Sequence, residues 1–121
     1  MAQNSINKPY DLEERTFQFA KEVRLFIKTL EKTIANIEDA KQVVRSSGSI
    51  GSNYIEANES LSKKDFVYRI KISRKEAKES IYWLRLINET NQLPNKKLAE
   101  NLIQESTELK KIFSAIVEKT K

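Results

Sequence analysis

The sequence contains neither cysteine nor histidine among its 121 residues. Disulfide bridges, metal ligation by thiolate or imidazole, a cysteine nucleophile and a histidine general base are therefore excluded together. Proline and glycine occur only twice each, which is too few for the many tight turns of a β-sandwich or a barrel. These absences predict an all-α, non-enzymatic protein that carries no cofactor.

Long hydrophobic runs are also missing. No stretch approaches 18 uninterrupted apolar residues, and the first ten residues lack the apolar segment of a signal peptide. We therefore expect a cytoplasmic protein that does not enter a membrane.

Positive charge is in modest excess, since 22 Lys and Arg stand against 17 Asp and Glu for a net charge of +5. A basic balance of this kind favours a polyanionic partner.

The hydrophobic spacing divides the chain into four helical segments. Apolar or small residues recur at alternating intervals of four and three, the pattern of a helix with one buried face. The spacing predicts helices over about 11–34, 37–60, 63–91 and 95–119, with residues 1–9 as a flexible N-terminus. Helices of similar length joined by short links must alternate in direction. We therefore expect one domain over residues 1–121, folded as an up-and-down antiparallel four-helix bundle.

Capping residues predict where these helices begin. Asp11 followed by Glu14 resembles a capping box at the first helix, and Ser62 marks the third. Asn36 and Asp39 are the candidate caps of the second helix.

The run SSGSIGSN at 46–53 has the composition of a loop, because each interior glycine costs a helix about 1 kcal/mol relative to alanine. The four-three spacing nevertheless continues through it from Val43 to Ala57. We predict one continuous helix, in which Ser47, Gly48 and Gly51 let a neighbouring backbone approach closely.

The basic excess belongs to the predicted third helix. Residues 61–92 contain eight Lys and Arg against four Asp and Glu. Cations recur every seven residues outside its buried face, with Arg74 beside them, at Lys64, Lys71, Lys78 and Arg85. Lys63, Arg69 and Lys75 flank this row, and Tyr68 and Tyr82 interleave with it. Such a row could neutralise phosphates, and the tyrosines could stack on bases.

Two other interpretations of this helix remain open. A charged helix face is usually only solvated. Tyr68, Ile72, Tyr82 and Leu86 also form a second apolar line away from the buried face, which a monomeric bundle would leave in water. A contact between subunits explains that line better than base stacking does.

The predicted second helix carries polar residues close to its buried side, namely Arg45, Asn53 and Glu56. A carboxylate there could act as a general base or as half of an acidic metal site. A hydrogen-bonded polar layer that fixes the register of the helices is the favoured interpretation. We therefore assign no catalytic and no metal-binding residue.

The run RSSGSIGSNYIEA at 45–57 resembles the second helix of the four-helix bundle proteins related to the 23S rRNA intervening-sequence protein, also called S23 ribosomal protein. The segments KKDF at 63–66 and SIYWL at 80–84 resemble that family's third helix. Asp11-Leu12, Arg15-Thr16-Phe17 and Phe19-Ala20 resemble its opening helix. The resemblance covers roughly residues 11–90, and the last segment matches only in its pattern.

The resemblance implies a small bacterial protein whose bundles assemble as a ring-like homopentamer, and it brings no catalytic residues. The sequence is similar also to the accessory variability protein of diversity-generating retroelements, a basic pentamer that contacts nucleic acid and a reverse transcriptase. We expect an oligomeric module that binds RNA or DNA, with structured RNA associated with ribosomal RNA as the favoured target. The alternative is an interaction scaffold whose basic face binds an acidic partner protein.

Overall fold

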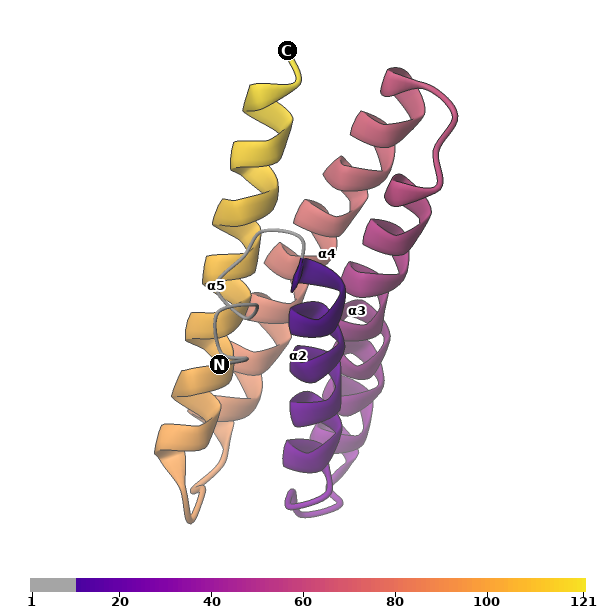
Figure 1. The fold of residues 1–121 in the computed structure, drawn as a ribbon. Coiled ribbons are helices and arrows are strands. Elements are labelled where there is room, and N and C mark those ends of the chain that lie inside the picture. Colours follow the sequence, from indigo (N-terminus) through magenta and orange to yellow (C-terminus); the bar gives the residue numbers. More distant parts are fainter. Residues whose placement is uncertain (1–10) are drawn as a thin grey trace, which may run out of the picture.

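A computed structural model describes residues 11–121, which form four α-helices and no strand. The helices are α2 (Leu12–Ile27), α3 (Ile34–Asn58), α4 (Lys63–Thr90) and α5 (Lys96–Lys119). Consecutive helices run in opposite directions and lie side by side (Figure 1). The predicted up-and-down four-helix bundle is therefore confirmed. The segment 1–9, predicted to be flexible, lies outside the described residues.

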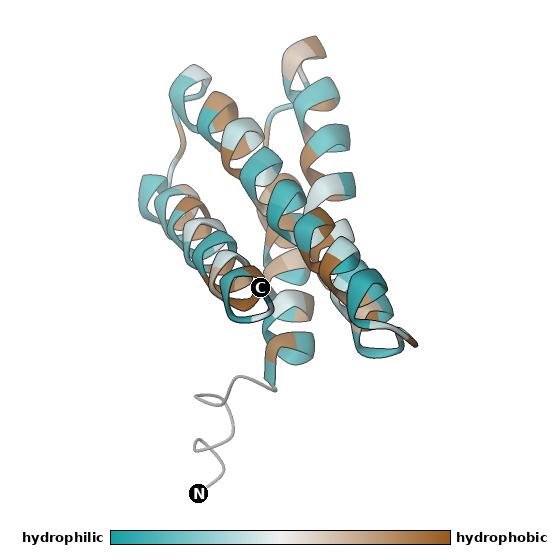
Figure 2. Cartoon of the chain, turned by 90° about the horizontal axis from the view of Figure 1, so that it is seen from above, coloured by the Kyte–Doolittle hydropathy of each residue, from teal (hydrophilic) through white to brown (hydrophobic). Residues whose placement is uncertain are grey.

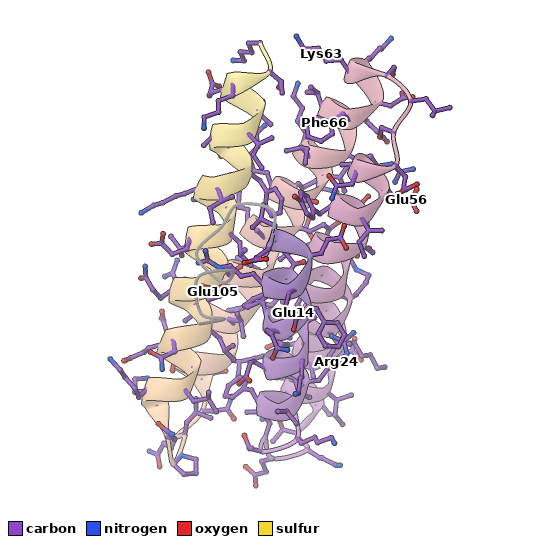
Figure 3. All side chains as sticks on the ribbon, in the orientation of Figure 1. Glu14, Arg24, Glu56, Lys63, Phe66 and Glu105 are labelled. Atoms are coloured by element: carbon purple, nitrogen blue, oxygen red, sulfur yellow. The ribbon has the colours of Figure 1, made fainter. Side chains whose placement is uncertain are left out.

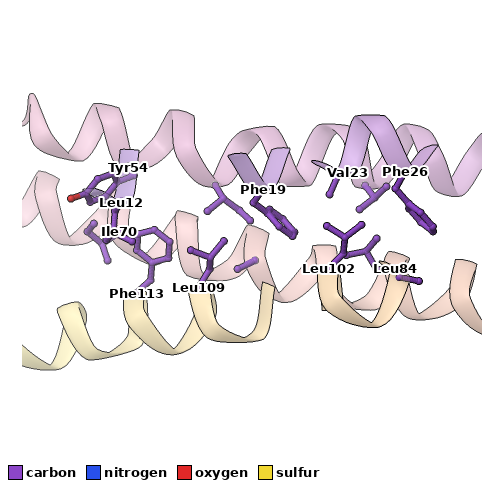
Figure 4. Packing of buried hydrophobic residues seen from close by; sticks show 14 of the residues in the cluster. Leu12, Phe19, Val23, Phe26, Tyr54, Ile70, Leu84, Leu102, Leu109 and Phe113 are labelled. Atoms are coloured by element: carbon purple, nitrogen blue, oxygen red, sulfur yellow. The ribbon is translucent and has the colours of Figure 1, made fainter. Parts of the chain in front are cut away.

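The hydrophobic core runs along the axis of the bundle. Phe26 of α2, Tyr54 of α3, Leu84 of α4 and Phe113 of α5 are all buried in it (Figure 4). The rings of Tyr54 and Phe113 lie 5.8 Å apart between their centroids. Each large apolar side chain buried in this way stabilises the fold by about 1.5–3 kcal/mol. Hydrophobic residues face the space between the helices, and hydrophilic residues cover the outside (Figure 2).

Helix α2 is shorter than predicted, because it ends at Ile27 and not near residue 34. Thr29 tightens the chain there, since both its backbone N–H and its hydroxyl donate to the carbonyl of Phe26, at 2.9 and 2.7 Å. Leu30 still packs against the core, but from the connecting turn. Residues 28–33 contain no glycine or proline to mark this end, and Leu30 continued the apolar spacing past it.

The predicted caps of α3, Asn36 and Asp39, are wrong. The N-cap is Thr33, whose hydroxyl accepts from the backbone N–H of Asn36 at 3.1 Å. The side chain of Asn36 instead pairs with that of Asn91, each amide donating to the other's oxygen, at 2.8 and 2.9 Å. This pair joins the start of α3 to the residue that follows α4.

The capping box predicted at Asp11 does not form, since the side chain of Asp11 makes no capping hydrogen bond. Glu14 accepts instead from Gln18 at 2.7 Å, one turn along α2. The cap predicted for α4 is confirmed, because the hydroxyl of Ser62 accepts from the backbone N–H of Asp65 at 3.1 Å.

The glycine-containing run lies inside α3, which is one continuous helix as predicted. The contact with α2 explains why glycine occupies these two positions. A Cβ atom at position 51 would lie 2.7 Å from Oγ1 and 3.1 Å from Cβ of Thr16. At position 48, the guanidinium of Arg24 lies over the glycine and donates to the carbonyl of Val44 at 3.4 Å. The missing side chains therefore let α2 approach the backbone of α3.

Helices α2 and α5 are joined across the bundle by an ion pair between Arg15 and Glu105. The guanidinium donates to both carboxylate oxygens, at 2.7 and 2.9 Å. These hydrogen bonds, more than the nearby charges of Glu105 and Glu108, raise the pKa of Arg15 above its ordinary value. A two-point contact of this kind fixes the relative orientation of the two side chains.

Candidate nucleic-acid interface

The outward face of α4 carries the cations that the sequence singled out. Ile70, Ala77 and Leu84 are buried on the opposite face. We call the cationic stripe the five residues Lys64, Lys71, Arg74, Lys78 and Arg85. Four of them are exposed and Arg74 is half-buried. At 1.5 Å per residue, cations seven residues apart are separated by about 10 Å, and the whole stripe extends over about 30 Å.

Most cations of the stripe have no acidic neighbour. Within residues 11–121, four of the five members make no ion pair, and the exception is Arg85, whose guanidinium lies 3.5 Å from the carboxylate of Glu89. The flanking Lys75 lies 3.9 Å from the carboxylate of Glu76. Both Arg85 and Glu89 are well exposed, so their pairing is weak. The stripe therefore presents positive charge that the described part of the chain leaves uncompensated.

A shallow hollow of about 460 Å³ lies at the N-terminal end of the stripe. Three lysines surround it, Lys63, Lys64 and Lys71, together with Val67 and Tyr68. Lys63 projects from the first turn of α4 (Figure 3), where the helix dipole adds positive potential. The ring of Tyr68 is 61% exposed. The hollow thus combines an aromatic surface with three ammonium groups.

The second exposed tyrosine lies near the other end of the stripe. Tyr82 is 58% exposed, and its ring meets that of Trp83 edge to face at 5.0 Å between centroids. Ile72 and Leu86 are both half-buried, and Leu86 is one turn along α4 from Tyr82. The predicted second apolar line therefore lies along the same outer side of α4 as the cations. The isolated chain exposes an aromatic and aliphatic strip next to a basic one.

The predicted layer of Arg45, Asn53 and Glu56 forms in part, because Arg45 and Asn53 make hydrogen bonds to α4 and Glu56 does not. Arg45 donates to the carboxylate of Glu79 at 3.1 Å, near the surface between α3 and α4. Asn53 accepts from the guanidinium of Arg69 at 3.0 Å. Glu56 is exposed and points away from the bundle (Figure 3). The prediction failed for Glu56 because this residue is next to the buried Ala57 in the sequence but lies outside the buried face of α3.

Deeper in the bundle, small hydroxyl groups make the buried polar contacts between helices. The hydroxyls of Ser46 and Ser80 lie 2.8 Å apart between α3 and α4. Ser73 donates to the carbonyl of Ile50 at 2.8 Å, and Ser106 of α5 donates to a carbonyl of α4 at the same distance. Ser73 and Ser80 follow the same four-three spacing as the buried Ile70, Ala77 and Leu84, which form the seam of α4. That spacing does not identify the hydrogen-bond partners of the two serines.

Glu76 is the buried carboxylate that sequence reasoning missed. Only 5% of it is exposed. Its Oε1 lies 3.4 Å from the guanidinium of Arg45 without making a hydrogen bond. The residue lies next to Ala77 in the seam of α4, a position that marked it as near the core but not as a charge within it. Arg45 thus bridges two carboxylates of α4 and holds α3 against it.

Neither a metal-binding cluster of side chains nor a membrane-spanning helix is found in residues 11–121. No group of three or more Asp and Glu side chains between residues 11 and 121 is arranged to hold a metal ion. None of the helices in this part of the chain has an apolar stretch long enough to cross a bilayer.

Comparison with known proteins identifies relatives of this bundle. The family described as 23S rRNA-intervening sequence protein matches residues 9–115. A crystal structure from Bacteroides thetaiotaomicron, of a protein with unknown function from the S23 ribosomal protein family, superposes with a TM-score of 0.76. That protein is 30% identical, and the match covers 87% of this chain and 96% of the other. No curated protein matches the sequence. The chain belongs to the 23S rRNA-intervening sequence protein family.

Proposed function

We propose that this protein is a non-enzymatic, oligomeric module that binds nucleic acid through the cationic stripe of α4 and acts in the cytoplasm. The observation that carries the proposal is the row of exposed cations without carboxylate partners in the described part of the chain. The family description refers to a sequence within 23S rRNA, and it favours structured RNA over DNA as the ligand.

Binding through the stripe rests on charge and shape. Each lysine or arginine neutralises one phosphate and releases its condensed counterions, which makes affinity strongly dependent on salt. The hollow beside Tyr68 holds one phosphate among its three lysines, and the exposed ring of Tyr68 offers a face on which an unpaired base stacks. Tyr82 offers a second such face near Lys78 and Arg85. The side chains of the stripe select for phosphate spacing and helical shape, not for base sequence.

The apolar line of Tyr68, Ile72, Tyr82 and Leu86 serves a contact between subunits in this proposal. A ring-like homo-oligomer, with five copies as the family resemblance implies, would cover part of the line and repeat the stripe around the ring. Repetition multiplies a weak contact, because the second and later stripes bind an RNA that is already held nearby. In such a ring, a tyrosine at the edge of the contact remains available to the ligand.

The test is charge reversal on the stripe. The triple variant Lys71→Glu, Arg74→Glu and Lys78→Glu should lose at least about a hundredfold in affinity for a structured RNA, because three phosphate contacts become repulsive. A matched control reverses three exposed lysines of α5, at Lys97, Lys111 and Lys119. Both variants change the net charge by the same amount, so a general electrostatic effect weakens RNA binding equally in the two.

The expected result is loss of binding in the stripe variant alone, with the helical circular dichroism spectrum of both variants unchanged. Equal loss in both variants would contradict a localised interface. Unchanged RNA affinity in the stripe variant would contradict the proposed function outright.

The second candidate function is an interaction scaffold whose basic face binds an acidic partner protein. The observation that favours it is the apolar line beside the cations, because protein interfaces combine aromatic and aliphatic contacts with a charged rim. The resemblance to the accessory variability protein of diversity-generating retroelements implies a reverse transcriptase as one candidate protein partner. This function predicts weak nucleic-acid binding without preference for structured RNA, and a stable complex with a purified acidic partner that the stripe variant abolishes.

A further inference from the structure

A second exposed surface lies between α2 and α3, away from the cationic stripe. It is a groove of about 530 Å³ with mostly apolar walls. Phe17 of α2 is 61% exposed in it, and Leu25 of α2 and Ile55 of α3 are each about half exposed. Three large apolar side chains open to solvent at one groove are more than a solvated helix face requires.

The floor of the groove is made of small residues. Gly48, Gly51 and Ser52 of α3 line it, together with Thr16 of α2, whose side chain lies over Gly51. The same glycines admit Thr16 and Arg24 of α2, which brings the two helices close together.

The apolar residues have the spacing that a docking helix requires. Phe17 and Leu25 are eight residues apart on α2, which is about 12 Å along the helix axis. A helix lying in the groove would place apolar side chains two turns apart against them, in the manner of amphipathic helices bound to hydrophobic grooves. Phe17 offers a ring on which a base could stack, but Leu25 and Ile55 are aliphatic and offer none. The groove therefore fits a protein helix better than a polynucleotide.

The charges at the rim decide the character of the partner. Lys21, Arg24 and Lys28 line the groove, and the one carboxylate that lines it, Glu13, already accepts a hydrogen bond from Asn58 at 3.1 Å. The rim is therefore basic and favours acidic residues on both sides of a partner's apolar face. A second copy placed on the groove by two-fold symmetry would bring the three cations against their own counterparts, which is unfavourable. A ring would instead place a different surface of the next copy on the groove, and the sedimentation experiment below tests for that occupant.

We propose that the groove between α2 and α3 docks an acidic amphipathic helix of a partner protein. This site is separate from the cationic stripe, so the protein could hold a nucleic acid on α4 and a protein helix on α2 and α3 at the same time. The inference does not depend on the proposed nucleic-acid binding.

The test uses two synthetic 21-residue helical peptides as probes. Both carry the same leucine seam at heptad spacing, flanked by glutamates in one peptide and by lysines in the other. Fluorescence anisotropy titrations of the full chain at about 0.15 M salt measure their affinities. We expect the glutamate peptide to bind at least about tenfold more tightly than the lysine peptide. The double variant Phe17→Ser and Leu25→Ser should reduce that affinity by at least about tenfold.

A charge-swap variant makes the test specific. The variant Lys21→Glu and Lys28→Glu leaves Arg24 in place over Gly48, and it should reverse the preference so that the lysine peptide binds more tightly. Charge reversal at Lys71 and Lys78 on α4 serves as the control and should leave peptide binding unchanged.

Four results of the peptide titrations would overturn the proposal. These are no binding of the glutamate peptide, equal binding of both peptides, binding that survives the double serine variant, and loss of peptide binding in the α4 control. A fifth is dissociation of the protein into monomers by the double serine variant in sedimentation velocity, which would assign the groove to a second copy of this chain. Loss of RNA binding in that same variant would assign it to nucleic acid.

Discussion

The two glycines of α3 should respond in opposite ways to the same substitution. Both lie inside a helix, where alanine is favoured over glycine by about 1 kcal/mol. At position 51 a new Cβ would lie 2.7 Å from Oγ1 of Thr16, which is closer than the two atoms can approach. Thr16 cannot move away easily, because it is buried and its hydroxyl donates to the carbonyl of Leu12 at 2.7 Å. At position 48 the nearest atom is the end of the exposed Arg24 side chain, at 3.3 Å.

Overpacking of a well-packed contact costs about 1–3 kcal/mol. Gly51→Ala should therefore lower the free energy of unfolding by up to about 2 kcal/mol, after the gain in helix propensity is subtracted. Gly48→Ala should leave it unchanged or raise it by up to about 1 kcal/mol, since Arg24 can swing into solvent. Urea denaturation followed by circular dichroism measures both values. In a double-mutant cycle, Thr16→Ala should recover part of the loss at position 51 and none at position 48.

Two outcomes would refute this reasoning. If Gly51→Ala stabilised the protein as much as Gly48→Ala, the close approach of α2 to α3 would be wrong. If Thr16→Ala showed no coupling to position 51, Thr16 would not be the residue that the new Cβ contacts. Gly48→Ala introduces the same side chain into the same helix, so comparing the two variants removes the general effects of alanine on the unfolded chain.

Two other contacts give testable values. Ser46→Ala should lower the free energy of unfolding by about 1 kcal/mol because it leaves the buried hydroxyl of Ser80 without its partner, whereas replacing both serines by alanine should be closer to neutral; chemical denaturation of the three variants compares them. Glu105→Gln should cost at most about 1 kcal/mol, because both partners are about one-third exposed, and the cost should shrink in about 1 M salt. The raised pKa of Arg15 keeps its guanidinium charged at neutral and at moderately alkaline pH, so the cost should be equal at about pH 7 and pH 10.

The fold was largely predictable because the four-three spacing is a strong signal in every helix. The spacing from Val43 to Ala57 even outweighed the two glycines of α3, which a propensity scale alone would have read as a break. The end of α2 was not predictable, because it depends on the hydrogen bonds of Thr29 and on a cap at Thr33. Threonine is not rare inside helices, so the sequence carried no clear signal for the end of α2.

The polar interior was harder to predict than the apolar core. Buried apolar positions follow from periodicity, but a hydrogen bond joins two residues that are distant in the sequence. The pairing of Asn36 with Asn91 spans 55 positions and is decided by how two helix ends meet. Glu56 and Glu76 show the same limit, because a small rotation of a helix decides which carboxylate is exposed and which is buried. The cationic stripe escaped this limit, since a seven-residue repeat keeps one face over any length of helix.

The most direct test of the central claim is the salt dependence of RNA binding. A structured RNA and a duplex DNA of matched length are titrated with the protein across a salt series. Five stripe cations per protomer that each neutralise one phosphate predict a slope of log affinity against log salt of about −3.5 to −4.5, with RNA preferred at physiological salt. The stripe variant should flatten that slope by about two units or more. Negligible binding at physiological salt, or an equal slope in the variant, would contradict the account.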